Sequence, residues 1–184
     1  MKLKNKLTVL AISLLLLFTT SCDIVDALST YPVNIPLSQT FSTSGTNTTI
    51  AEEESFCVSN DDTYQEYKDK IKKVTFVKVA FRTISYSPSN LQGDITLYLK
   101  DASGVTLFTE SITGAKPGDY VNTPYEISLE DSEIQAIDSY LETALAANSE
   151  LCFTSGINIQ ITSGGTTNSI EGAIDIVFEA ETEL

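Results

Sequence analysis

The sequence contains no histidine and no tryptophan among its 184 residues. Histidine is the commonest general base near neutral pH and the commonest protein ligand of transition metals. Its absence excludes Ser-His-Asp and Cys-His catalysis, and it excludes every zinc site that uses histidine. The sequence also lacks a Ser-x-x-Lys motif and a glycine-rich phosphate loop between a strand and a helix. We therefore predict a protein that is not an enzyme and that holds no cofactor and no metal.

Basic residues are scarce. Three of the eleven lie in residues 1–21, whereas none of the twenty-five acidic residues does, so residues 22–184 carry a formal net charge of −17. Proteins that bind nucleic acid need clustered lysine and arginine to displace counterions, and this balance excludes that class of partner. The charge favours a well-solvated surface and cationic partners.

The first residues have the layout of a secretory signal. Lys2, Lys4 and Lys6 precede an apolar run of twelve residues, Leu7–Phe18. A basic start followed by an apolar segment of about 7–15 residues is typical of a signal peptide. A membrane-spanning helix needs roughly 20 apolar residues, which is more than this run supplies.

The apolar run ends in Phe18-Thr19-Thr20-Ser21-Cys22. This segment resembles the lipobox of bacterial lipoproteins in a loose form, because Thr19 stands where leucine is usual. The resemblance covers residues 1–22. It implies that the Cys22 thiol is acylated, for example with palmitate, that residues 1–21 are removed, and that the new N-terminus is acylated as well. An ordinary secretory signal with a chance cysteine is the alternative.

This resemblance implies a lipid-anchored protein of the cell envelope. The outer membrane, on its periplasmic or surface face, is favoured over the inner membrane. We expect residues 22–32 to form a short tether and residues 33–184 to form a single domain. The expected partners are the membrane, through the N-terminal lipid, and an envelope protein or glycan.

Lipidation of Cys22 would leave two cysteines, Cys57 and Cys152, each in a strand-like setting. Two cysteines in an oxidising compartment favour one disulfide. Two buried free thiols are the alternative, since cysteine packs as a small apolar residue.

The apolar periodicity predicts a mainly β fold. Residues 94–112 alternate and contain a turn, which is typical of a β-hairpin. Apolar residues at helical spacing, with acidic residues at the start, predict helices over about 62–72 and 131–147. A shifted pattern at residues 77–79 indicates either a bulge or burial on both faces. We predict an antiparallel β-sandwich of about eight strands with two peripheral helices.

Two groups of residues could serve function or structure. The acidic clusters 52–54, 61–62 and 130–133 lack the alternating spacing of calcium loops, and the last two are explained by helix starts. Four tyrosines are predicted near strand ends or on outward faces, where they either pack or contact a partner: Tyr86, Tyr98, Tyr120 and Tyr125. The composition favours a non-catalytic binding or structural domain. The alternative is a small carboxylate-dependent hydrolase acting on an envelope polymer or glycan.

Overall fold

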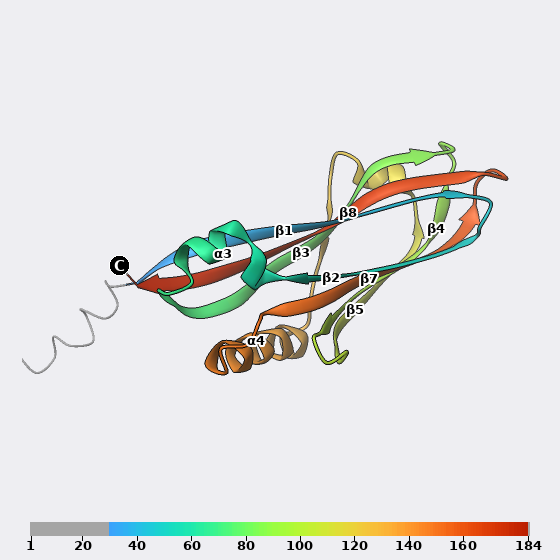
Figure 1. Ribbon diagram of the computed structural model, residues 1–184. Helices are drawn as coiled ribbons and strands as arrows, with labels where there is room; N and C mark the ends of the chain where they lie inside the picture. The colour runs from blue at the N-terminus through green and yellow to red at the C-terminus, as the bar shows by residue number, and fades with distance from the viewer. Residues whose placement is uncertain (1–29, 184) are drawn as a thin grey trace, which may run out of the picture.

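The computed structural model describes residues 30–183, so the predicted signal peptide, Cys22 and most of the predicted tether lie outside the described residues. Two four-stranded antiparallel sheets make up the fold (Figure 1). Sheet A has the order β1 (Thr30–Gly45), β8 (Asn168–Glu183), β3 (Ile71–Ser87) and β6 (Tyr125–Ile127). Sheet B has the order β2 (Thr49–Cys57), β7 (Cys152–Ser163), β4 (Gln92–Asp101) and β5 (Thr106–Ala115).

The strand pairing defines a jelly roll. β1 pairs with β8, β2 with β7, β3 with β6 and β4 with β5, always antiparallel. This is the pattern of one long hairpin of eight strands wrapped into two sheets. The predicted antiparallel sandwich with two peripheral helices is confirmed.

The two sheets bury their alternating apolar positions against each other. In β8 the inward residues Ile170, Ile174, Ile176 and Phe178 are at most 4 % exposed. In β4 the inward residues are Ile95, Leu97 and Leu99, as the alternation predicted. The predicted irregularity is a bulge, because the pairing of β3 with β8 shifts between Phe76 and Lys78.

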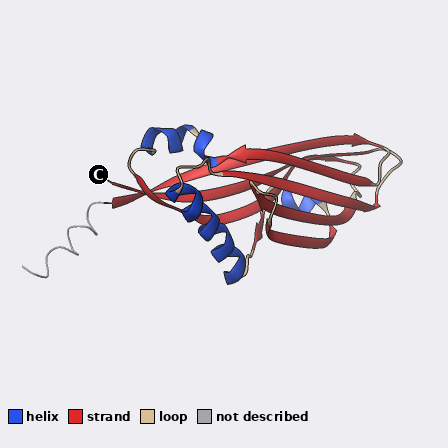
Figure 2. Cartoon of the chain, turned by 60° about the horizontal axis from the view of Figure 1, so that its bottom comes forward, coloured by secondary structure: helices blue, strands red, loops and turns tan. Residues whose placement is uncertain are grey.

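Helix α4 (Asp131–Ala146) closes one side of the sandwich, where it packs on β3 and reaches β5 (Figure 2). The Glu133 carboxylate accepts the backbone N–H of Glu130 at 2.9 Å, which satisfies a donor at the helix start. The buried stripe consists of Ile137, Leu141 and Ala144. Asp138 accepts the backbone N–H of Phe76 at 2.8 Å, so the helix also satisfies a donor at the β3 bulge.

Helix α3 (Asp62–Tyr67) follows the 3-10 turn η1 (Val58–Asn60) and contacts β1. It begins where predicted but is one and a half turns long, because β3 already starts at Ile71 and pairs there with β8. The lysine-rich segment after Tyr67 therefore leads into a strand instead of extending the helix. A second 3-10 turn, η2 (Pro117–Tyr120), precedes β6.

The start of β1 and the end of β8 lie at the same end of the molecule (Figure 1). Thr30 pairs with Glu183 there, and the ladder continues without interruption to Gly45 and Asn168. β1 thus begins three residues before the expected domain boundary at residue 33. No helix within residues 30–183 is both long and apolar enough to cross a membrane.

Candidate functional site

The two cysteines of the domain form a disulfide. Cys57 is the last residue of β2 and Cys152 the first of β7, and the two stand directly opposite each other in sheet B. The bond joins positions 95 residues apart in the sequence. Beyond it, the Val58 N–H donates to the Leu151 carbonyl at 2.8 Å and extends the strand pairing by one step. The disulfide predicted from the cysteine count is present.

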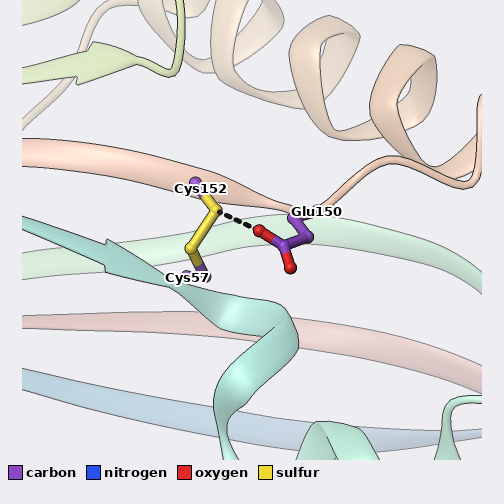
Figure 3. Close-up of side chains that lie close together, drawn as sticks. All are labelled: Cys57, Glu150 and Cys152. Atoms are coloured by element: carbon purple, nitrogen blue, oxygen red, sulfur yellow. Dashed lines mark hydrogen bonds between the residues drawn. A yellow bond between two sulfur atoms is a disulfide. The ribbon is translucent and has the colours of Figure 1, made fainter.

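Glu150 lies beside this disulfide (Figure 3), with Oε2 3.7 Å from Cys152 Sγ. A disulfide sulfur carries no hydrogen to donate, so this contact is not a true hydrogen bond. The ligand atoms of Cys57, Cys152 and Glu150 lie within 4.8 Å of one another. Because only thiolates coordinate metals in this way, the disulfide leaves this group unable to hold a metal ion.

The exposed face of sheet B carries a second group of residues, which we call the Tyr98 cluster: Glu53, Tyr98 and Lys100. The Tyr98 hydroxyl donates to Glu53 Oε1 at 2.7 Å, and Lys100 forms an ion pair with the same oxygen. Lys100 Nζ also lies 4.7 Å from the centre of the Tyr98 ring. The ring lies over Gly156 of β7, where any larger residue would collide with it. A tyrosine, an acid and a base are thus fixed on one flat surface.

The environment of the cluster changes its protonation. Burial, followed by the hydrogen bond to Glu53 and its charge, raises the pKa of Tyr98 to about 12. The hydrogen bonds from Lys100 and Tyr98 lower the pKa of the Glu53 carboxyl. Tyr98 is therefore a neutral phenol at neutral pH and a poor general base, so the cluster is suited to binding or to linking β2 and β4 across β7.

We expect Glu53→Gln to lower the pKa of Tyr98, because the variant removes the negative charge that opposes ionisation. The raised pKa of Tyr98 also makes the free energy of unfolding depend on pH. The folded state favours the neutral form of Tyr98. The contribution of Tyr98 to stability is therefore complete below pH 10 and is lost as the pH rises from 10 towards 12. The measurement is the tyrosine Cζ chemical shift against pH, with Tyr98→Phe to assign the signal. An unchanged Tyr98 titration in Glu53→Gln would contradict the contribution of Glu53 to the raised pKa.

The other three tyrosines singled out in the sequence pack against the domain. Tyr120 makes edge-to-face contacts with Phe81 and Tyr125, with ring centres 5.6 and 5.8 Å apart. Tyr125 donates its hydroxyl to Glu110 at 2.9 Å, and Tyr86 lies against Gly118. Among these four, only Tyr98 lies on the exposed face of a sheet with both an acidic and a basic partner.

The acidic clusters have three different roles. Asp61 caps α3 by accepting the backbone N–H groups of Thr63 and Tyr64 at 2.8 and 3.3 Å. The 130–133 cluster begins α4, as expected. Strand β2 runs through the cluster 52–54, and the side chains of this cluster alternate between the two faces of sheet B.

No protein-family model matches the sequence, and no curated protein matches it. The fold resembles solved structures of Desmodium yellow mottle tymovirus (10% identity, 84% of this chain and 89% of that chain, TM-score 0.37) and turnip yellow mosaic virus (13%, 85% and 96%, 0.36). It also resembles infectious bursal disease virus Gx strain (14% identity, TM-score 0.35) over 84% of this chain, but the chain spans only 32% of that one. At these TM-scores the likenesses carry no functional argument.

Proposed function

We propose that this chain is a bacterial lipoprotein, anchored in the cell envelope through Cys22, whose jelly roll binds a partner or serves a structural role without catalysis. The observation that carries the proposal is the position of Thr30. It lies eight residues after Cys22 and pairs with Glu183 at one end of the sandwich. At about 3.3–3.6 Å per residue, an extended chain of this length reaches at most about 29 Å. The tether would hold that end near the bilayer, and the opposite end would project away from it.

Two features favour binding over hydrolysis. A glycosidase that uses paired carboxylates needs one carboxylic acid with a raised pKa. Hydrogen bonds lower the pKa of Glu53. The pKa of Asp101 is also lowered: burial opposes this, but hydrogen bonds from the Ser103 hydroxyl and backbone N–H groups outweigh it, so neither of these two carboxyl groups fits the role of that acid. The absence of histidine removes the commonest alternative base.

Metabolic labelling with a palmitate analogue tests the anchor. The wild-type chain should incorporate the label and appear in the membrane fraction, whereas Cys22→Ala should lose both, because a thioether-linked lipid needs the Cys22 sulfur. Ser21→Ala is the matched control: it keeps a small residue before the cysteine, so labelling should persist. Membrane fractionation of Cys22→Ala that equals the wild type would refute the proposal.

A further inference from the structure

The jelly roll is closed unequally on its two sides. Helix α4 covers the side formed by β3 and β5, and α3 covers the first part of β1. Tyr67 of α3 contacts Tyr31 of β1 edge-to-face, with ring centres 6.0 Å apart. Farther along β1, beyond α3, a groove of about 210 Å³ lies between the edge strands β1 and β2, with β7 and β8 contributing to its walls. We call it the edge groove.

Two carboxylates in this groove occupy inward positions of the sandwich. Glu52 pairs with Ile157 and Glu54 with Ser155, so both side chains share the face on which Ile157 is buried. Glu53, between them, points to the opposite face and binds Tyr98. Inward positions of a sandwich are normally apolar. Glu52 and Glu54 remain exposed there because β2 is an edge strand and the groove admits solvent.

The floor of the edge groove combines apolar side chains with one hydroxyl group. Phe41, Ile157 and Ile174 line it and are 8 %, 1 % and 4 % exposed. Ser155 is only 3 % exposed and lines the groove, where its hydroxyl has no hydrogen-bond partner within residues 30–183 but keeps contact with solvent. Gln39, on the inward face of β1, adds an amide beside them. Carboxylates, a hydroxyl and an amide oxygen therefore meet above an apolar surface.

Protection of the sheet edge explains part of this arrangement. Inward-pointing charges and prolines on edge strands prevent pairing with another sheet, and β1 carries Pro32 and Pro36. That role accounts for the charge of Glu52 and Glu54. It does not account for a hollow in which an apolar floor and the Ser155 hydroxyl lie beside the two carboxylates.

We infer that the edge groove accepts a basic side chain, lysine or arginine, from an extended segment of a partner protein in the envelope. A lysine ammonium has three donors and an apolar stem, which match the acceptors and the floor. The volume is below the roughly 300–1,000 Å³ of small-molecule pockets, so it suits one side chain. The net charge of −17 attracts a cationic segment.

The position of the groove is compatible with such a partner. Thr40 lies ten residues along β1 from Thr30, and at about 3.3 Å per residue this places the groove about 33 Å from the end that carries the tether. This inference gives a partner chemistry to the proposed binding role, and it does not depend on the lipid.

The test uses residues 22–184 with Cys22→Ser, which removes the acylation site, and a capped hexapeptide of alternating lysine and threonine. Amide chemical shifts report binding by residue. We expect the lysine peptide to shift the signals of β1, β2 and Ser155, and an equivalent glutamate–threonine peptide to leave them unchanged. Glu52→Gln/Glu54→Gln should weaken binding about tenfold through the loss of two charged acceptors. Ser155→Ala should weaken it by a smaller factor.

Glu126→Gln/Glu142→Gln makes the same change in net charge at exposed positions outside the groove, and it should leave the affinity unchanged within about twofold. Equal weakening in both double variants would overturn the inference, because attraction would then come from the overall charge. Absence of peptide binding would also overturn the inference. The proposed lipid anchor would be unaffected by that result, because palmitate labelling tests it separately. Tight calcium binding at Glu52 and Glu54 without peptide binding would replace the inference with a metal site.

Discussion

Replacing Cys57 and Cys152 together with serine is expected to lower the free energy of unfolding by about 4–5 kcal/mol. The disulfide closes a loop between positions 95 residues apart, and the entropy it removes from the unfolded chain grows with loop length. A loss of this size is a large fraction of the roughly 5–15 kcal/mol that stabilises a typical domain. The stability of the domain would then depend on an oxidising compartment, which the proposed envelope location provides.

Urea denaturation of the oxidised wild type and the double serine variant measures this loss. The matched control is Ser55→Ala/Thr154→Ala, which removes the adjacent cross-strand pair on β2 and β7, where the two hydroxyls lie 2.9 Å apart. That control should cost less than about 1 kcal/mol, because it removes a surface hydrogen bond and closes no loop. If the two double variants lose the same free energy, loop closure is not the source of the stability.

Phe153→Ala is expected to cost about 3–5 kcal/mol, the range for truncating a buried phenylalanine. Phe153 is 1 % exposed and directly follows the disulfide. Its ring lies 5.4 Å from Phe178 of sheet A and 5.0 Å from Tyr140 of α4. The truncation would therefore open a cavity where both sheets and the helix meet, and the rigid surroundings would fill it only partly.

Phe56→Ala supplies the comparison. Phe56 pairs with Phe153 across β2 and β7, with ring centres 5.7 Å apart, but it is only partly buried at the sheet edge. Its truncation should cost roughly 1–2 kcal/mol, in proportion to the smaller apolar area it removes from solvent. Thermal and urea unfolding of both variants measure the difference. Equal losses of unfolding free energy in the two variants would show that Phe153 contributes no more to the core than Phe56 does.

Local patterns carried most of the fold prediction. The alternation of Ile95, Leu97 and Leu99 identified the β4–β5 hairpin, and the stripe of Ile137 and Leu141 identified α4 to within one residue of its end. The helix before β3 was predicted too long. Acidic residues at its start and lysines after Tyr67 are favourable to the helix dipole both in a helix that ends at Tyr67 and in a longer one, so they do not indicate where the helix ends. Pairing of Ile71 with Thr182, more than one hundred residues away, decided where the helix ends.

The candidate sites depended on distant contacts to different degrees. The Cys57–Cys152 pair could be predicted, because only two cysteines remain once Cys22 is assigned to the lipid. The Tyr98 cluster could not, although alternation placed Tyr98 and Lys100 on the outward face, because nothing local indicates that Glu53 lies beside them. The edge groove could not be predicted either, because no local pattern indicates that Glu52 and Glu54 lie beside β1. An edge strand tolerates inward carboxylates because solvent reaches them.

The continuous pairing of β1 with β8 has a mechanical consequence. A lipid held in the bilayer would pull on the start of β1, whereas a partner held by Glu52 and Glu54 would pull on β2, which follows β1 in the chain and lies in the other sheet. Force along a strand acts on its antiparallel neighbour in shear, so the sixteen residue pairs from Thr30–Glu183 to Gly45–Asn168 would resist together instead of opening one after another. Forced unfolding is governed by the unfolding barrier, and this geometry raises that barrier for tension between membrane and partner.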